Sequence, residues 1–160
     1  YCGLMLTPSG PKVLEFNCRL GDPETQPIVS RMDCDLAEVL SATADGHLDK
    51  VPVGWKPGAS VCVVMASGGY PGKFETSCEI IGLEEAGAIP GVTVFHAGTK
   101  REGNKYYTCS GRVLGVTATA ASIDAARFTA YQAVHKIHFA GAHYRTDIAA
   151  SSERAKVAGN

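Results

Sequence analysis

Residues 14–20 alternate strictly between apolar and polar side chains and lead into a Gly-Asp-Pro turn at 21–23. The apolar positions are Leu14, Phe16, Cys18 and Leu20, and the polar positions are Glu15, Asn17 and Arg19. Alternate side chains of a strand point to opposite faces. The segment therefore predicts a strand with one apolar face packed on a core, while the other face carries three polar groups about 7 Å apart.

The polar row has a specific chemical use. A carboxylate and an amide oxygen are hard ligands suited to Mg²⁺, which makes Glu15 and Asn17 candidate metal ligands. Arg19, one step further along, can hold a carboxylate or a phosphate with two hydrogen bonds. The alternative, a half-solvated surface strand without a ligand, stays open on composition alone.

The residues after the strand favour an anion site. Gly21 permits a sharp exit, Asp22 can cap a helix, and Pro23 suits the first helical position. The free N–H groups at a helix N-terminus favour anions. The polar row is therefore expected beside the start of a helix.

The remaining pattern divides the chain into two parts. Apolar residues recur every fourth position over 24–45 and predict one helix that stops at Gly46. Residues 51–59 read as a linker, in which Trp55 is expected to pin the chain to the core. Further strands are predicted at 1–7, 60–66, 79–82, 92–96, 105–109 and 112–119, and a second helix at 123–137.

Composition excludes several classes of protein. The net charge is −1, which argues against a nucleic acid or an anionic membrane held by bulk charge. No apolar run approaches the roughly 18 residues of a membrane-spanning helix. The six cysteines contain no Cys-x-x-Cys pair, so no metal-finger signature is present. An even number of cysteines permits disulfides, but reduced thiols in a cytoplasmic compartment are expected. The chain starts without Met inside a strand-like segment, so a targeting segment would lie upstream and an organellar location stays open.

Five segments carry a resemblance to a known family. Residues 15–26, which read Glu-Phe-Asn-Cys-Arg-Leu-Gly-Asp-Pro-Glu-Thr-Gln, closely resemble the end of the ATP-grasp domain in the phosphoribosylamine–glycine ligase (glycinamide ribonucleotide synthetase) family. The segments that resemble later parts of the same family are 64–72, 94–99, 111–117 and 141–148. Their order and spacing cover nearly the whole chain.

The resemblance implies an α+β fold. It places the C-terminal portion of an ATP-grasp subdomain, a β-hairpin plus a helix, at residues 1–50 and the linker at 51–59. A small, mostly antiparallel β-domain with one long helix, the C-terminal domain of the family, is expected at 60–150, and a frayed tail at 151–160.

The resemblance also implies a reaction. ATP phosphorylates the carboxylate of glycine, and the amine of 5-phosphoribosylamine then attacks the glycyl phosphate to give glycinamide ribonucleotide, ADP and phosphate. This is a step of purine biosynthesis that uses Mg²⁺ or Mn²⁺. In the family the adenine pocket lies upstream of the Glu-x-Asn strand, so this chain is expected to need upstream ATP-grasp segments and to be inactive alone.

Residue roles follow from the matched positions near the strand. The resemblance implies that Glu15 and Asn17 hold the metal that bridges the ATP phosphates, and that Arg19 acts catalytically on the substrate carboxylate or its acyl phosphate. Asp22 is expected to be a helix cap, with an active-site acid as the alternative, and Glu24 is a further candidate for substrate binding. A salt bridge from Arg19 to Asp22 or Glu24 is the non-catalytic alternative.

Three later positions are further candidates for substrate binding. Gly69 lies in a glycine-rich run that could cradle an anion, although a tight turn is the commoner reason for such a run. His96 is a candidate acid or base at a strand end, with a structural role as the alternative. Arg112 is a candidate for the ribose phosphate.

Two positions depart from the family pattern, and two other functions stay open. Leu20 stands where a phenylalanine is usual, on the side expected to face the core, and Ser110 stands where a glycine is usual. The alternative functions are another ATP-grasp carboxylate–amine ligase or carboxylase subunit, and a non-catalytic binding or structural fragment. Fusion of the parent chain to other purine enzymes stays open as well.

Overall fold

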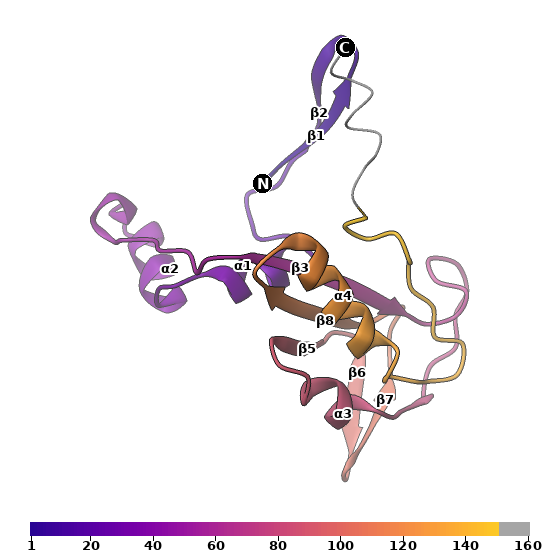
Figure 1. Cartoon of the computed structure of the whole chain (residues 1–160). Coiled ribbons are helices and arrows are strands. Elements are labelled where there is room, and N and C mark those ends of the chain that lie inside the picture. The colour runs from indigo at the N-terminus through magenta and orange to yellow at the C-terminus, as the bar shows by residue number, and fades with distance from the viewer. Residues whose placement is uncertain (151–160) are drawn as a thin grey trace.

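The computed structural model describes residues 1–150, and the predicted tail at 151–160 lies outside the described residues. Figure 1 shows a projecting N-terminal hairpin, a helical segment and a sheet domain. In chain order the elements are β1 (Cys2–Thr7), β2 (Gly10–Phe16), α1 (Thr25–Arg31), α2 (Leu36–Ala44), the 3-10 turn η1 (Leu48–Lys50), β3 (Ala59–Ala66), β4 (Glu79–Ile80), α3 (Leu83–Gly87), β5 (Val92–His96), β6 (Thr99–Glu102), β7 (Lys105–Thr108), β8 (Arg112–Ala120) and α4 (Ile123–Val134).

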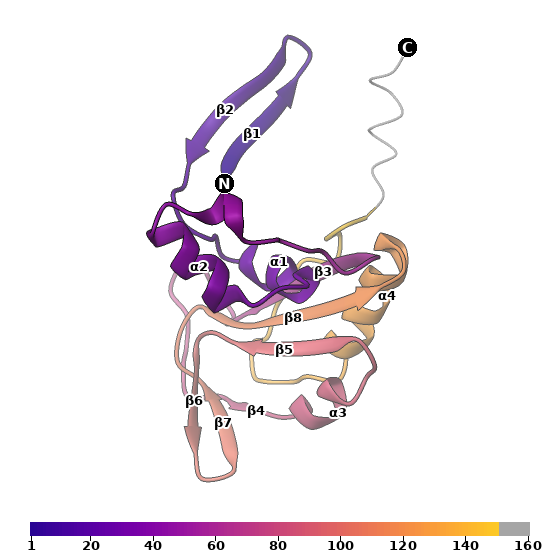
Figure 2. The same ribbon diagram turned by 90° about the vertical axis from the view of Figure 1, so that its left-hand side faces the viewer.

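The main sheet has the order β3-β8-β5, with antiparallel neighbours throughout. Its strands are rich in β-branched residues, which suit a pleated, buried surface. The longest helix, α4, covers one face, and α1 packs against β3 and β8 from the other side (Figure 2). This architecture confirms the predicted α+β fold with a small, mostly antiparallel β-domain and one long helix.

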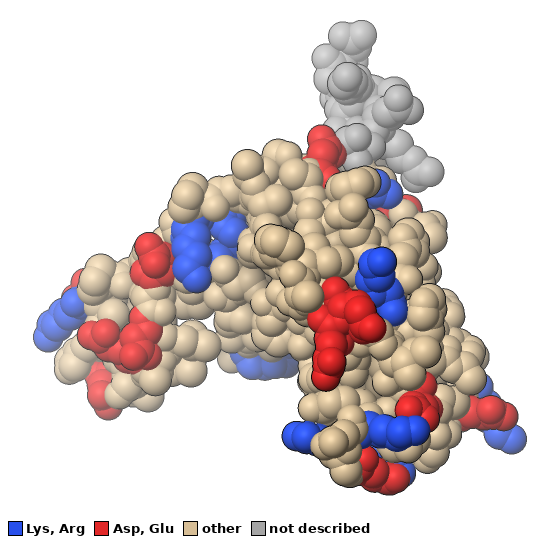
Figure 3. All heavy atoms as spheres, turned by 60° about the horizontal axis from the view of Figure 1, so that its bottom comes forward, with Lys and Arg blue, Asp and Glu red and all other residues tan. Residues whose placement is uncertain are grey.

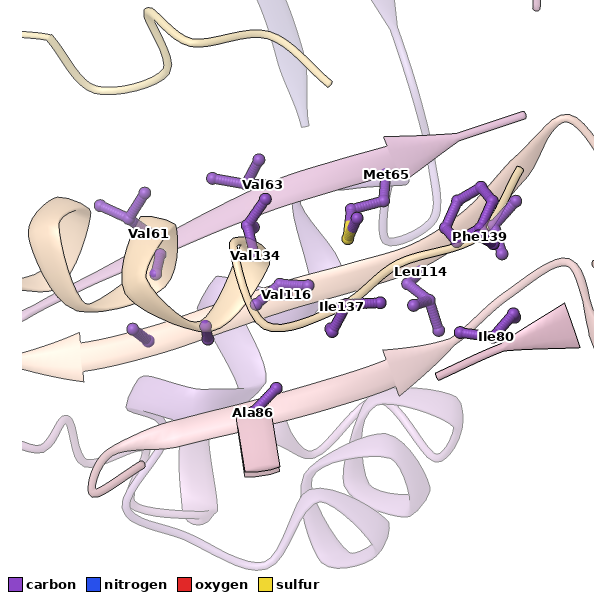
Figure 4. Packing of buried hydrophobic residues seen from close by; sticks show 14 of the residues in the cluster. Val61, Val63, Met65, Ile80, Ala86, Leu114, Val116, Val134, Ile137 and Phe139 are labelled. Atoms are coloured by element: carbon purple, nitrogen blue, oxygen red, sulfur yellow. The ribbon is translucent and has the colours of Figure 1, made fainter. Parts of the chain in front are cut away.

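The hydrophobic core lies between α4 and the main sheet (Figure 4). Val63, Met65 and Val116 are completely buried on the sheet side. The helix contributes mainly alanines, and their small side chains let α4 approach the strands closely. The buried alanines of α4 are Ala126, Ala130 and Ala133. Ser122 caps this helix, as predicted, by accepting a hydrogen bond from the backbone of Ala125 at 3.2 Å.

A second sheet, of order β4-β7-β6, extends from the end of the main sheet. Its hairpin turns at Gly103, which has a φ of 59°. The Gly-Asn pair at this turn predicts the hairpin, and the structure confirms it. The strand β6 was missed because its polar sequence, Thr-Lys-Arg-Glu, has no apolar alternation.

The single helix predicted over 24–45 is wrong, because the structure divides the segment into α1 and α2. Asp35 starts the second helix by accepting hydrogen bonds at its N-cap, including one from Ala37 N at 2.8 Å. Between the helices, Met32 is extended and pairs with Trp55. The linker is thus attached through its backbone, and the Trp55 side chain is 55% exposed rather than pinned to the core.

The strand predicted through residue 20 is also wrong in its second half, because β2 ends at Phe16. The expected apolar face does not pack on a core within residues 1–150, and Leu20 does not face a core either. The exposed fractions are 64% for Leu14, 74% for Phe16 and 46% for Leu20. A two-stranded hairpin has no second layer to cover it, so its apolar side chains stay at the surface.

Candidate functional site

The Glu15 carboxylate lies on β2 beside the first residue of the chain. The Tyr1 hydroxyl donates a hydrogen bond to Glu15 Oε1 at 2.7 Å. This bond is the main reason why the pKa of Glu15 lies below its ordinary value, and the Asn17 side chain lowers that pKa further. The same interaction raises the pKa of Tyr1. Glu15 is therefore ionised at neutral pH, which is the form that binds cations.

Asn17 continues the backbone pairing of the hairpin beyond the end of β2. Its N–H donates to Tyr1 O at 2.8 Å, and its carbonyl accepts from the Tyr1 amino group at 2.7 Å. Residues two apart in extended backbone share a side, so the Glu15 and Asn17 side chains lie together. The described residues contain no group of three or more His, Cys, Asp or Glu side chains that could hold a metal ion. A carboxylate and an amide nevertheless fit Mg²⁺, which is commonly held by one or two protein oxygens together with phosphates and water.

Arg19 departs from the predicted row. It lies in the bend after β2, is exposed, and donates to the carbonyl of Leu20 at 3.2 Å. Within residues 1–150 it makes no salt bridge to Asp22 or Glu24, so the non-catalytic alternative is not found. Its charge still contributes to lowering the pKa of Glu15. The structure brings Arg19 near the carboxylate without placing it on the same strand.

Asp22 pairs with a residue that is 90 positions away in sequence. Arg112 donates from Nη1 to the main-chain carbonyl of Asp22 at 2.9 Å, and its Nη2 lies 3.3 Å from the Asp22 carboxylate. The predicted helix cap is wrong, because α1 has its N-cap at Glu24 and no side-chain capping bond. Pro23 is likewise not the first helical position, since α1 begins at Thr25.

Glu24 lies behind this loop. Its Oε2 is buried and has no hydrogen-bond partner among the described residues. It packs against Gly21, where an added Cβ would come within 3.0 Å of Glu24 Cδ and 2.7 Å of Tyr1 Cε1. The glycine is therefore required by the close approach of these two side chains. The arrangement brings Glu24 to the same cluster as Tyr1 and Glu15.

The glycine-rich run after β3 forms a tight turn. Gly69 has a φ of 91°, and Tyr70 N donates to Ser67 O at 3.1 Å. Gly72 N closes a second turn onto Gly69 O at 2.8 Å. The tight turn considered for this segment is confirmed, and an anion contact at Gly69 stays a prediction.

Segments far apart in sequence meet at this turn. Ser67 N donates to Gly111 O at 2.8 Å, and its hydroxyl donates to Ser110 O at 2.9 Å. Ala66 N donates to the carbonyl of His143 at 2.8 Å. The family segments beginning at 64, 111 and 141 are thus joined directly by hydrogen bonds.

The segment 94–99 joins the same cluster from β5. Gly98 N donates to Arg112 O at 2.9 Å, and Cys109 N donates to Gly98 O at 2.8 Å. A Cβ on Gly98 would lie 3.1 Å from the Cα of Ser110. Ser110, which stands where the family usually has glycine, therefore packs closely against Gly98.

An open pocket of about 340 Å³ lies beside the glycine-rich turn. Its lining residues are Gly68, Lys73, Phe74, Glu75, Ala140 and Gly141. The lining therefore includes one cationic and one anionic residue beside three small ones.

His96 is held in a structural arrangement. Its ring stacks on Tyr106 with centroids 4.6 Å apart, and Nδ1 lies 2.9 Å from the Thr99 hydroxyl. Partial burial lowers the pKa of His96 below its ordinary value. A structural role for His96 accounts for these contacts, and a role as acid or base stays a prediction.

Two contacts could not have been found from local sequence patterns. The first is the Arg112–Asp22 pair. The second involves Gln26 of α1, whose side chain lies against Gly115 and whose Oε1 is buried without a hydrogen-bond partner in the described part of the chain. The only signal in the sequence is that Gln26 ends the segment 15–26 that carries the family resemblance.

The face shown in Figure 3 carries side chains of both charges. Figure 3 shows acidic and basic side chains interspersed over one face, separated by uncharged surface. No helix among residues 1–150 is both long enough and apolar enough to span a membrane.

Family models match both parts of the chain. The model described as "Phosphoribosylglycinamide synthetase, C domain" matches residues 60–151, and the one described as "Phosphoribosylglycinamide synthetase, ATP-grasp (A) domain" matches residues 1–25. The first match covers more than half of the chain.

Curated relatives and a solved structure agree with these matches. The chain is 52% identical to the phosphoribosylamine–glycine ligase of Rhodopirellula baltica over 92% of this chain and 34% of that protein. It is 47% identical to the enzyme of the same name from Caldanaerobacter subterraneus, over 94% of this chain and 35% of that protein. The crystal structure of phosphoribosylamine–glycine ligase from Thermotoga maritima superposes with a TM-score of 0.72 at 38% identity, covering 92% of this chain and 36% of that one.

The chain spans about a third of the length of the curated relatives it matches. Its hairpin lies within the region matched by the ATP-grasp model, and its main sheet lies almost entirely within the region matched by the C-domain model. On these findings the chain belongs to the phosphoribosylglycinamide synthetase family.

Proposed function

We propose that this chain supplies the metal-binding end of an ATP-grasp domain and the C-terminal domain of a phosphoribosylamine–glycine ligase. The observation that carries the proposal is the pairing of an ionised Glu15 with Asn17 at the end of β2, inside the segment matched by the ATP-grasp family model. The domain limits of 1–50 and 60–150 belong to this proposal, as does a cytoplasmic location.

The reaction follows from this assignment. The glycine carboxylate takes the γ-phosphoryl group of ATP, and the amine of 5-phosphoribosylamine displaces phosphate from the glycyl phosphate to form the amide. When bound, Mg²⁺ or Mn²⁺ neutralises charge on the transferring phosphoryl group. Glu15 and Asn17 would hold that ion, and the Arg19 guanidinium would orient the substrate carboxylate.

The exposed face of the hairpin supports a partner from the same enzyme. Leu4, Leu6, Val13 and Phe16 are 51%, 82%, 54% and 74% exposed. A hairpin with such a face needs a further layer to be stable. The proposed cover is the remainder of the ATP-grasp domain, because the ATP-grasp family model matches this chain only at residues 1–25.

The loops of the sheet domain would close one side of the site. Gly69 and His96 are the candidates for substrate contact there, together with Asp22 and Glu24 on the loop before α1. Supporting this role, Arg112 links the sheet domain to that loop directly.

The test is ADP release by the native polypeptide that carries this sequence. It is supplied with ATP, Mg²⁺, glycine and freshly made phosphoribosylamine, and each component is omitted in turn. Release that requires both glycine and phosphoribosylamine supports the proposal. Release that persists without glycine indicates another ATP-grasp carboxylate–amine ligase or carboxylase. Failure to release ADP, together with failure to bind ATP in a nucleotide titration, supports a non-catalytic role and overturns the proposal.

A further inference from the structure

Arg112 at the start of β8 reaches across to the loop between β2 and α1. Its Nη1 donates to the main-chain carbonyl of Asp22 at 2.9 Å, and its Nη2 lies 3.3 Å from the carboxylate of the same residue. Asp22 falls in the region matched by the ATP-grasp family model, and Arg112 falls in the region matched by the C-domain model. The side chain therefore joins the two parts of the chain at one residue.

The base of this side chain is held firmly. The Arg112 carbonyl accepts a hydrogen bond from Gly98 N at 2.9 Å, and Arg112 pairs with Ala66 at an irregularity in the β3–β8 ladder. An exposed ion pair by itself stabilises a protein only weakly. A guanidinium that donates a hydrogen bond to the main chain of a residue and also pairs with its carboxylate instead fixes the direction of the loop that it holds.

A second contact lies further along the same strand. The side chain of Gln26 packs on Gly115, where an added Cβ would be 3.4 Å from Gln26 Nε2 and 3.3 Å from Cys62 Sγ. Gly115 is three residues beyond Arg112, which corresponds to about 10 Å along a strand. Two contacts at that separation determine both the position and the orientation of the segment that carries Asp22 and Gln26.

We propose that Arg112 is a positioning residue, which holds the loop between β2 and α1, and with it Asn17 and Arg19, in register with the glycine-rich loops of the sheet domain. It acts through Asp22 and does not contact a substrate. The consequence for catalysis rests on the proposed ligase function. A misplacement of about 1 Å at a reacting centre costs up to about a hundredfold in rate, so the loss of this contact is expected to impair the reaction with every substrate alike.

The kinetic test compares variants of the native polypeptide. Arg112→Met is expected to lower kcat/KM about tenfold to a hundredfold for ATP, glycine and phosphoribosylamine in parallel, and to raise the Mg²⁺ concentration needed for activity. The kcat/KM of Arg112→Lys should lie between the values for Arg112→Met and the wild type, because an ammonium lacks the planar, bidentate geometry of a guanidinium. Asp22→Asn keeps the main-chain carbonyl, so its loss of kcat/KM should be smaller. The double variant should have the same kcat/KM as Arg112→Met.

A matched control separates positioning from general stability. Arg127 of α4 also donates two hydrogen bonds to main-chain carbonyls, those of Ile148 and Thr146, both at 3.0 Å. Arg127→Met should leave the kinetic constants and the Mg²⁺ requirement close to those of the wild type. If it matches Arg112→Met in both, the effect is one of stability and the proposal is overturned. An effect of Arg112→Met confined to the KM of one substrate, additive with Asp22→Asn, would show direct substrate binding and would also overturn it.

Amide hydrogen exchange gives a readout that does not depend on the reaction. In Arg112→Met, peptides covering 17–25 should exchange at least about fivefold faster, while peptides of α4 stay protected. Unchanged exchange in 17–25 overturns the positioning role. A wild-type protein that shows no ligase activity overturns the proposed function instead, and exchange then decides whether Arg112 holds the loop.

Discussion

The packing of Tyr70 on Gly111 allows a quantitative prediction for Gly111→Ala. Gly111 is buried, and an added Cβ would lie 2.6 Å from Cε2 and 3.0 Å from Cγ of the Tyr70 ring. Carbon atoms normally stay about 3.5–4.0 Å apart, and the Cδ2 atom of the ring would lie closer still, so the ring must retreat by about 1.5 Å. The φ of Gly111 is not in the left-handed region, and the cost is therefore steric only.

Overpacking of this kind typically costs about 1–3 kcal/mol. Tyr70 is half-buried, and its ring centroid lies 6.1 Å from that of Phe74. The neighbouring ring therefore restricts how far the Tyr70 side chain can move. We expect a loss of about 2 kcal/mol in the free energy of unfolding. For a domain of under 100 residues this corresponds to a decrease of about 8–16 °C in Tm.

The assay is thermal and urea unfolding of the native polypeptide and its variants under identical conditions. Gly87→Ala is the control, because nothing lies within 4 Å of an added Cβ there and alanine favours the helix α3. Tyr70→Ala removes the obstructing ring, so the double variant should be no less stable than Tyr70→Ala alone. Additive losses in the double variant, or a Gly111→Ala protein as stable as the wild type, would refute the steric reasoning.

Three further predictions concern the site and its surroundings. Glu15→Gln should lower turnover about a hundredfold or more at every Mg²⁺ concentration without changing Tm, as measured by ADP release, and wild-type turnover at saturating Mg²⁺ would contradict the metal assignment. Gly115→Ala should cost about 1 kcal/mol in urea unfolding, because the Cβ would press on Cys62 and on Gln26 of α1; a stability equal to that of the wild type would show that α1 shifts freely. Since burial lowers the pKa of His96, the unfolded state takes up its proton first, so stability should fall as the pH decreases below about 6.5. His96→Gln should weaken this dependence in melting curves between about pH 7.5 and 5.5, and an identical pH dependence in the variant would contradict the assignment.

Local patterns predicted the elements whose determinants are local. The apolar run of β3, the Gly-Asn turn of the β6–β7 hairpin and the Ser122 cap of α4 are confirmed, because each depends on residues within a few positions of one another. The division of 24–45 into two helices was missed. The apolar spacing runs through the break, whereas the break depends on pairing of Met32 with Trp55, more than 20 positions away.

The sequence alone also determined the chemistry available near β2. Carboxylate, amide and guanidinium groups at 15, 17 and 19 are properties of residue order, and the family resemblance rests on the same letters. Whether the apolar side chains between them are buried or exposed was decided by the tertiary structure. Alternation predicts that one face is apolar, but burial requires a second layer, and the described residues provide none over the hairpin.

The connection between the two parts of the chain was likewise decided only by the tertiary structure. Asp22 and Arg112 are each candidate site residues in the sequence, but no local pattern pairs them, and their pairing depends on where α1 docks on β8. This docking uses the absence of a side chain at Gly115, against which Gln26 packs. The sequence therefore determined which groups the site could use, and long-range packing determined which of them meet, because contacts between distant segments depend on how whole elements fit together.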